Sequence, residues 1–322
     1  MEGSGSGAGV KELCKNQLES CQQLVKSYPK VELLEKALHA VQSTLELITR
    51  IQDKAETSDD NKTILSEFTQ SCLDSTYHLE CQLVDKEFPD PIARGQITQI
   101  VQTLSTPLTL CGLLGCEVEQ LGTDIIECLH WRVGALMYMY CHMVLTVEER
   151  KKEIDVEHFK EILSLGAGHL NLMLSTRAPL SKDDDYMSHD TTVPALLQQG
   201  IFSDLHMLSL MYAGEMCHWY WELNSAPSQP TPSKDVQKTQ PGASLNDHDS
   251  SKESTLWCVM ELTQDIEFAR DWRDNFNSQK YGIEFLSKYV DVARGPLKDQ
   301  SWNYVQAVQL LVSLRKANSV SK

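Results

Sequence analysis

Cysteine and histidine are the residues of this chain with the most versatile chemistry, because they serve as metal ligands, nucleophiles and bases. The 322-residue sequence holds ten of each, and no two cysteines form a C-x-x-C pair. Cys128/His130 and Cys141/His142 fall on one predicted helix about four turns apart, or roughly 20 Å at 1.5 Å per residue. That separation is too large for the ligands of one tetrahedral ion. We therefore expect thiols and imidazoles in the core, no metal site and no cofactor.

Sequence motifs for nucleophilic catalysis and phosphate binding are also missing from the chain. It contains no G-x-S-x-G, no G-x-x-x-x-G-K-[ST] and no G-x-G-x-x-G. The acidic run Asp183–Asp185 lacks the ligand spacing and closing Glu of a calcium loop, which indicates a solvated loop. We therefore expect a protein that is not an enzyme. Two alternatives stay open: a helical enzyme with a concealed cysteine-based or carboxylate-based site, and a generic helical scaffold.

Glu215 is the polar residue that most needs an explanation, because it falls in an apolar helical segment. A carboxylate in such a place is costly unless it is paired or hydrogen-bonded. One interpretation is a buried ion pair or hydrogen bond, with Arg132 as a candidate partner. The other is a partner-binding carboxylate on a helix that is less enclosed than its composition suggests.

Two apolar segments, Ile125–Leu145 and Leu205–Trp221, contain the two Cys/His pairs and Glu215. A membrane span needs about twenty consecutive apolar residues. The first segment is cleanly apolar only from Val133 onward, and the second contains Glu215 and two histidines. Both segments are therefore predicted to be helices buried on all sides by other helices, with no direct insertion into a membrane.

The remaining sequence indicates further helices that cover these two, so we expect an all-α fold with a single multi-helix domain and two central, fully buried helices. Asn224–Thr255 is rich in Pro, Ser, Asp and Gln, and it offers too little apolar surface to offset its ordering entropy. The expected organisation is a flexible N-terminus (1–9), a first helical part (10–223), a disordered insertion (224–255), a C-terminal helical part (256–317) and a flexible tail (318–322).

Proline and glycine are expected to shorten one of the predicted helices and to weaken another. Pro107 is expected to end a short helix over Ile97–Leu104, because proline has no backbone N–H to donate. Gly166 and Gly168 are expected to weaken a helix over Glu153–Thr176 by about 1 kcal/mol each relative to Ala.

The overall charge points to protein partners. Formal charge is −16, from 45 acidic and 29 basic residues, and no basic stripe is present. Nucleic-acid binding needs such a stripe, and anionic membrane surfaces repel a chain without a polybasic cluster. The first residues, MEGSGSGAGV, do not have the pattern of a signal peptide. We therefore expect a cytosolic protein with reduced thiols that binds other proteins.

Four blocks of sequence together resemble a known family. They are LVDKEFP at Leu83–Pro89, IECLHWRVGALMYMYCH at Ile126–His142, GIFSDLHMLSLMYAGEMCHW at Gly200–Trp219 and GPLKDQSW at Gly295–Trp302. In their order and their sequence, these blocks are similar to the Rab-seven-interacting subunit of the Mon–Ccz guanine-nucleotide exchange complex. The N-terminal helices and the segment 224–255 match this family poorly.

The resemblance implies a non-enzymatic accessory subunit that binds the late-endosomal Rab GTPase and the Mon–Ccz heterodimer. It implies recruitment from the cytosol, through these partners, to late endosomal or mitochondrial membranes. It also implies a role in localising and stabilising the Rab during vesicle trafficking and autophagy of damaged mitochondria (mitophagy). The family has no catalytic residues to transfer to this chain.

Phe88, Pro89 and Trp302 are the candidate partner-binding residues. Phe88 and Pro89 are expected to be extended between two helices, and Trp302 follows the break at Gly295 and Pro296. Interface energy concentrates in exposed aromatic anchors of this kind. The alternative is that both aromatic side chains fill the core at helix ends.

Overall fold

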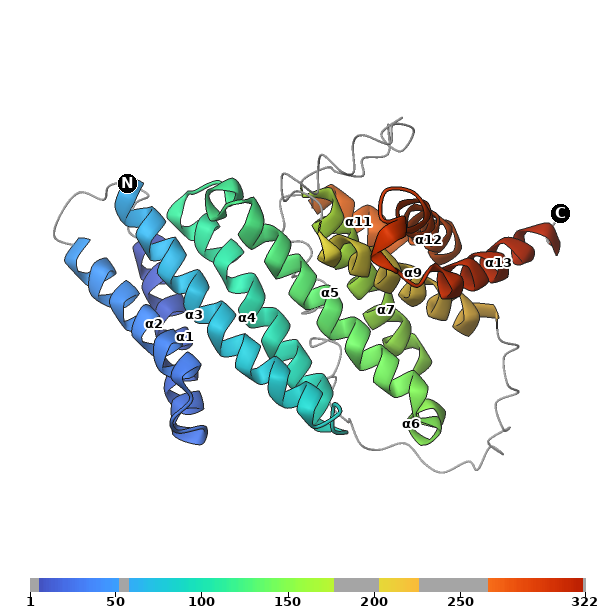
Figure 1. Cartoon of the computed structure of the whole chain (residues 1–322). Helices are drawn as coiled ribbons and strands as arrows, with labels where there is room; N and C mark the ends of the chain where they lie inside the picture. Colours follow the sequence, from blue (N-terminus) through green and yellow to red (C-terminus); the bar gives the residue numbers. More distant parts are fainter. Residues whose placement is uncertain (1–5, 52–57, 177–202, 226–265, 321–322) are drawn as a thin grey trace, which may run out of the picture.

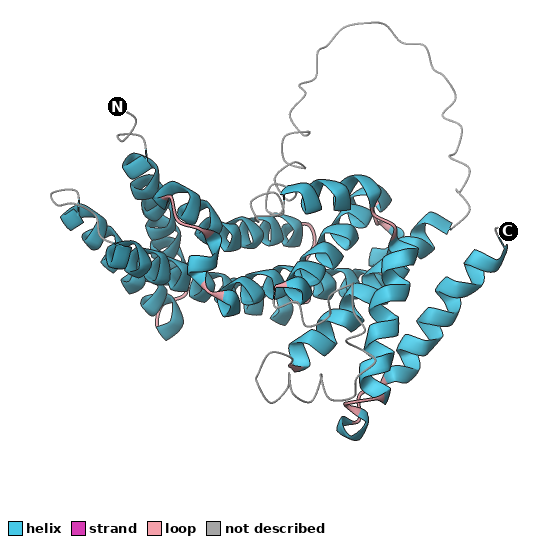
Figure 2. Cartoon of the chain, turned by 90° about the horizontal axis from the view of Figure 1, so that it is seen from above, coloured by secondary structure: helices cyan, strands magenta, loops and turns pink. Residues whose placement is uncertain are grey.

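The computed structural model describes residues 6–51, 58–176, 203–225 and 266–320, and every regular element in these ranges is helical (Figure 1). Figure 2 shows helices and connecting loops, with no strand in the described part of the chain. The all-α prediction is confirmed. Asp183–Asp185 and all but the first two residues of the predicted insertion 224–255 lie outside the described residues.

The first four helices form an N-terminal bundle. α1 packs against the other three, and α3 lies between α2 and α4. Figure 1 shows α2, α3, α4 and the following α5 as a row of neighbours. Their bounds are Ser6–Ser27 for α1, Glu32–Ile51 for α2, Ser58–Asp85 for α3 and Ile92–Leu114 for α4.

The later helices form a C-terminal bundle around α7. α7 packs against α5, α9 and α11, while α12 packs against α9 and α13. The main helices are α5 (Thr123–Thr146), α7 (Val156–Ser175), α9 (Asp204–Ser225), α11 (Ile266–Asn275), α12 (Ser278–Arg294) and α13 (Tyr304–Val320). Short turns of helix are η1 (Val118–Leu121), α6 (Glu148–Lys152) and η3 (Lys298–Gln300).

The most enclosed helix is α7, which corrects the prediction of two fully buried central helices. Every residue from Ile162 to Leu170 is buried. By contrast, α5 and α9 each keep a partly exposed face, with Trp131 on the first and Tyr212 on the second. The apolar character of α5 and α9 therefore predicted their central position correctly, but these two helices are less completely covered by their neighbours than predicted.

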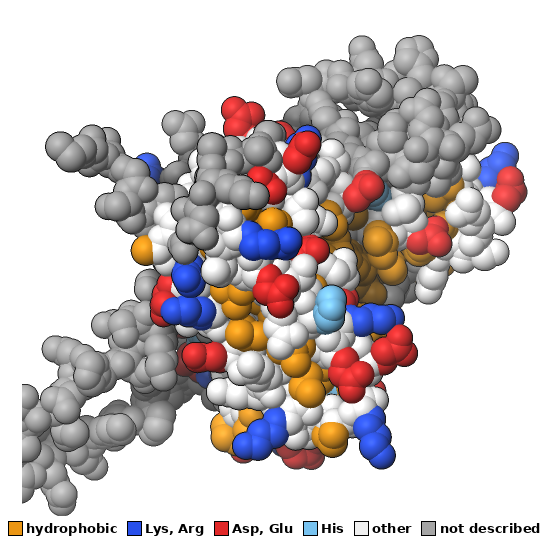
Figure 3. Space-filling model, turned by 90° about the vertical axis from the view of Figure 1, so that its left-hand side faces the viewer, with side chains coloured by type: hydrophobic (Ala, Val, Ile, Leu, Met, Phe, Trp, Pro, Cys, Tyr) orange, Lys and Arg blue, Asp and Glu red, His pale blue; other side chains and the backbone are white. Residues whose placement is uncertain are grey.

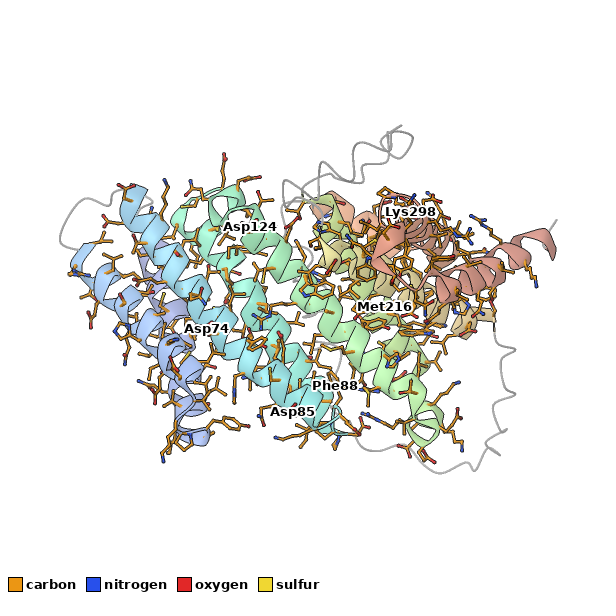
Figure 4. The ribbon with its side chains drawn as sticks, in the orientation of Figure 1. Asp74, Asp85, Phe88, Asp124, Met216 and Lys298 are labelled. Atoms are coloured by element: carbon orange, nitrogen blue, oxygen red, sulfur yellow. The ribbon has the colours of Figure 1, made fainter. Side chains whose placement is uncertain are left out.

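Glycine explains why α7 can be so enclosed. A Cβ added at Gly166 would lie 2.4 Å from Cε of Met216 and 3.0 Å from Cβ of Met137, so a larger residue does not fit there. Figure 4 shows Met216 in the middle of the C-terminal bundle. Gly166, which was expected to weaken this helix, is the residue that lets α5 and α9 approach it closely.

Pro107 lies inside α4 and does not end it, so the predicted short helix is wrong. The Thr106 hydroxyl donates to the carbonyl of Thr103 at 2.6 Å, which is the acceptor that Pro107 cannot serve. By length and composition α4 is also the one helix in the described ranges that could cross a membrane, and half of its most apolar stretch is buried inside the protein. Its apolar residues therefore face the other helices to a large extent.

Helix extends further at both ends of the chain than expected. α1 begins at Ser6, within the segment 1–9, and α13 continues to Val320, within 318–322. At Gly9 a Cβ would lie 3.2 Å from the side chain of Leu113, so the start of α1 packs closely against the end of α4. This contact gives the small residues of the N-terminus a reason to be helical.

Candidate partner interface

Aromatic side chains of α5 and α9 form a partly exposed stack that we call the aromatic seam. It comprises Trp131, Tyr138 and His142 of α5 with Tyr212 and Trp219 of α9. Tyr138 and Tyr212 are stacked with ring centroids 3.7 Å apart, and a tryptophan lies on each side of this pair, at 5.9 Å and 5.5 Å. The four large rings are partly buried and His142 is exposed. Partly exposed Trp and Tyr of this kind are enriched at protein interfaces.

The seam was missed from the sequence, although a signal for it is present. Trp131 and Tyr138 are seven residues apart, and so are Tyr212 and Trp219. Seven residues are two turns of helix, so each pair occupies one face. Two such aromatic pairs on two neighbouring helices indicate a shared surface.

Glu215 lies behind the seam and joins three helices. Its carboxylate accepts a 2.6 Å hydrogen bond from the Tyr138 hydroxyl and a second bond from the Gln306 amide of α13. Burial raises the pKa of the Glu215 carboxyl, and the two hydrogen bonds oppose this rise. The hydrogen-bond interpretation is therefore confirmed, with partners other than Arg132. The bonds fix α5, α9 and α13 relative to one another beneath the exposed rings.

Arg132 instead joins the two bundles. Its guanidinium binds Glu80 of α3 through two nitrogens, at 2.8 and 3.2 Å, and also donates to the Leu73 carbonyl and the Thr76 hydroxyl. Both charged side chains are largely buried, with 10% and 13% of their surface exposed. Burial raises the pKa of Glu80, and the adjacent Arg132 opposes this rise. This ion pair holds α5 against α3.

Phe88 is buried, which contradicts its predicted exposure. Only 1% of its surface is accessible, and its ring packs edge-on against Tyr140 of α5 at 5.9 Å. Figure 4 shows it at the end of the turn between α3 and α4, next to α5. The residue has φ of 54°, and its carbonyl accepts from Arg150, so the turn directs the ring inward. The alternative of a core role at a helix end is correct for Phe88.

Pro89 and Trp302 are partly exposed and remain predicted contact residues. The Trp302 ring packs edge-on against Tyr289 at 6.5 Å, and its indole nitrogen donates to Gln300 at 3.4 Å. The structure does not bring the two residues together: Pro89 precedes α4, which packs against α1, α3 and α5, and Trp302 precedes α13, which packs against α9 and α12. Each would therefore belong to a different contact surface.

A hollow of about 220 Å³ lies beside the turn that holds Phe88 and Pro89. Its polar lining consists of Asp90, Arg94, Tyr140, Arg150 and Glu153. Arg150 clamps the turn through Asp90, at 2.7 Å, and through the carbonyls of Glu87 and Phe88. The turn and hollow are thus one rigid unit shared by the two bundles.

Five buried cysteines are poorly suited to nucleophilic catalysis. Burial raises the pKa of the thiols of Cys14, Cys72, Cys111, Cys141 and Cys217. A thiol with a raised pKa carries little of the reactive thiolate at neutral pH.

Buried histidines and Glu127 form the second group of titratable side chains. His130 and His169 lie in contact, with their Nδ1 atoms 3.1 Å apart, and burial lowers the pKa of His130 to about 4. Burial raises the pKa of Glu127 to about 7, and this carboxylate lies 3.5 Å from Nε2 of His206. A carboxyl with that pKa could exchange protons near neutral pH, so Glu127 is the residue on which the carboxylate-based alternative rests. No group of three or more potential metal ligands occurs in the described part of the chain.

Comparison with known proteins identifies the relatives of this chain. A family model described as "RAB7A-interacting MON1-CCZ1 complex subunit 1" matches residues 38–315. Proteins of that name are similar over most of their length: 33% identity to the Mus musculus protein over 261 residues (77% of this chain, 76% of the relative) and 34% to the Danio rerio protein over 257 residues (78% of each). The Homo sapiens protein is 32% identical over 254 residues. No solved structure matches the chain significantly.

The chain belongs to this family.

The RAB7A-interacting MON1-CCZ1 complex subunit 1 family match confirms the resemblance seen in the four sequence blocks. The matched range begins in α2 and ends in α13, so it includes the aromatic seam, the hollow and Trp302 but not α1. Two of the blocks meet in space, because Phe88 of LVDKEFP packs against Tyr140 of the α5 block. The family similarity thus extends over the surfaces that could contact partners.

Proposed function

We propose that this protein is a non-enzymatic accessory subunit that binds a RAB7A-type GTPase and a MON1–CCZ1 heterodimer. The observation that carries the proposal is the similarity to relatives named for these interactions, which runs through both bundles. The aromatic seam supports it, since partly exposed tryptophan and tyrosine rings on a rigid helical surface suit protein contact.

The proposed role is to control where the GTPase is and how long it persists. The protein is cytosolic and is recruited by its partners to late endosomal or mitochondrial membranes. There it supports endosomal traffic and the autophagy of damaged mitochondria. A protein that binds the folded GTPase stabilises the bound form by mass action, in proportion to its concentration relative to the dissociation constant.

The test uses the purified full chain and RAB7A loaded with a fluorescent nucleotide. We expect binding of the chain to RAB7A or to purified MON1–CCZ1, with the rate of nucleotide release left at its intrinsic value. Accelerated release in the absence of MON1–CCZ1 would show that the chain is itself an exchange factor. Binding to neither protein would contradict the proposed function.

Variants of the seam show whether this surface carries the binding. Trp131→Leu with Trp219→Leu keeps apolar contact with the bundle but removes the exposed rings, so we expect binding to weaken about tenfold, or 1.4 kcal/mol. Tyr77→Ala is the control, because Tyr77 is an exposed aromatic residue on α3 outside the seam. Equal effects of the two changes, at unchanged melting temperature, would locate the binding elsewhere.

A further inference from the structure

The hollow beside the α3–α4 turn combines an apolar floor with a charged side, to which Arg94, Arg150, Asp90 and Glu153 contribute. Val144, Ile154 and Phe159 line it together with Arg94, Tyr140 and Arg150. Val144 and Phe159 are buried, so they form a floor. Its volume of about 220 Å³ is large enough for one or two side chains and too small for a folded segment. The hollow therefore fits a short stretch of an extended peptide.

Arg94 is the cation of this hollow that is free to bind a ligand. Its Nε donates to the Tyr140 hydroxyl at 3.4 Å, and its terminal nitrogens make no further bond within the described residues. The Arg94 side chain is exposed. Arg150 differs, because its donors are already used on Asp90 and the turn carbonyls. Arginine with two unused terminal nitrogens can bind a carboxylate through both of them.

The N-terminus of α4 adds to the same positive side. Pro91 occupies the position before the helix, no side chain caps it, and its first turn contains no acidic residue. The positive end of a long helix favours an anion placed there. Of the two carboxylates in the lining, Asp90 is paired with Arg150, and Glu153 is the one that opposes an incoming anion.

Two large apolar side chains near the α3–α4 turn are exposed to solvent. Ile92, in the first turn of α4, is 59% exposed, which is the highest value among the large apolar side chains of the described residues. Val84, in the last turn of α3, is 41% exposed.

We propose that this hollow docks a partner-protein segment in which an Asp or Glu lies next to a large apolar side chain. The carboxylate binds Arg94 at the N-terminus of α4, and the apolar side chain enters over Phe159 and Ile154. This rests on the proposed function for the identity of the natural partner, but the chemistry of the segment follows from the hollow alone. On a chain with formal charge −16, an acidic partner segment needs a local cation, and Arg94 supplies it.

The chemistry is tested first without any assumed partner. Random peptides displayed on phage are selected on the immobilised full chain, and the enriched peptides are measured against variants. We expect Asp or Glu beside a large apolar residue in the enriched set, and about tenfold weaker binding to Arg94→Glu. Arg94→Lys should restore part of the binding, and Glu153→Gln should tighten it. Arg50→Glu, which makes the same charge change on exposed α2, is the matched control.

Several results would overturn the proposal. They are an enriched set without acidic residues, equal loss of binding in Arg94→Glu and Arg50→Glu, and displacement of the peptides by inorganic phosphate at comparable concentration. The last result would indicate a site for free phosphate. Melting temperatures of the variants show whether any loss reflects unfolding, and Arg94→Lys keeps the test valid if Arg94→Glu unfolds.

A second measurement separates this inference from the proposed function. Binding of the same variants to purified MON1–CCZ1 and RAB7A is compared with binding of the unmodified chain. If the unmodified chain binds neither protein but selects acidic-apolar peptides through Arg94, the proposed partners are wrong and the docking hollow stands. If it binds either protein but selects no such peptides, the hollow is wrong and the proposed function stands.

Discussion

The two bundles have interiors of different chemistry. In the N-terminal bundle, cysteines lie among isoleucines and leucines: Cys14, Cys72 and Cys111 share one core cluster with Phe68, and Gln17 donates to the hydroxyls of two buried serines. In the C-terminal bundle, leucine, methionine and aromatic side chains belong to one continuous core that contains the histidine pair and extends to Phe88 and to Ile97 and Leu104 of α4. The difference teaches that the first interior satisfies buried polar groups through neighbouring hydroxyls, whereas the second relies on large apolar side chains, some of which reach the surface as the aromatic seam.

Surface features follow the same division. Figure 3 views the end of the molecule formed by α1 and α2, where a band of hydrophobic side chains runs between charged ones. Partly buried leucines of these helices, including Leu13, Leu18, Leu38 and Leu45, pack against the small core. The aromatic seam belongs to the other bundle, and the family match omits α1. The C-terminal bundle is therefore the part in which we expect most of the specific recognition.

Removing the Arg132–Glu80 ion pair between the bundles should lower the stability more than any other change. Arg132→Ala leaves the Glu80 carboxylate buried without its cation, which typically costs about 3–5 kcal/mol. Calorimetry should show a lower transition temperature, and two transitions if the bundles then unfold separately. Arg132→Met combined with Glu80→Leu is the control, because it removes both charges and should be less destabilising. A single-variant loss below about 1 kcal/mol would show that the pair does not couple the bundles.

Acid should destabilise the C-terminal bundle through its histidines. The pKa of His130 is about 4 when folded and near 6.5 when unfolded, so the unfolded chain binds more protons between these values. Stability is therefore lost as pH falls from about 6.5 to about 4, by about 3 kcal/mol for this residue. The raised pKa of Glu127 acts oppositely, with stability lost as pH rises from about 4.5 to about 7.

The contribution of His130 is isolated by comparison with His130→Phe. Urea unfolding at several pH values should show that the free energy of unfolding of the unmodified protein falls relative to that of the variant as pH falls to 4. A pH-independent gap would mean that His130 is not buried as a neutral imidazole.

A substitution in the polar interior of the N-terminal bundle should lower stability less than Arg132→Ala does. Gln17→Leu removes hydrogen bonds to Ser71 and Ser75 at 3.2 and 3.1 Å, and we expect a loss of about 1–2 kcal/mol. Adding Ser71→Ala and Ser75→Ala should recover much of this loss, since the two hydroxyls that lose the Gln17 donor are then absent. A triple variant less stable than the single one, measured by urea unfolding, would mean that packing rather than hydrogen bonding decides this region.

The fold class could be predicted from the sequence because apolar residues repeat with a helical period. The enclosed position of α7 could not, since the cost of Gly166 within a helix is local, whereas the benefit of its close contact with Met216 appears only in the assembled bundle. Pro107 was misjudged for a related reason: the Thr106 hydroxyl supplies the missing donor.

The candidate site was harder to predict than the fold. Phe88 has no helical period to show which way it faces, and its inward direction depends on Arg150, far along the chain. Exposure of the seam depends on α7 covering only one side of α5 and α9. Single-sequence patterns give the elements, but which faces stay open depends on how those elements pair.

The Arg150 clamp has a consequence for the order of folding. Its two backbone acceptors, on Glu87 and Phe88, lie 63 and 62 residues earlier in the chain. During synthesis α1–α4 emerge first, with a turn whose aromatic side chain and carbonyls have no partner until α5 and α6 follow. The N-terminal bundle is therefore expected to fold before its α3–α4 turn is covered, and this exposed turn is a place where a chaperone could bind the nascent chain.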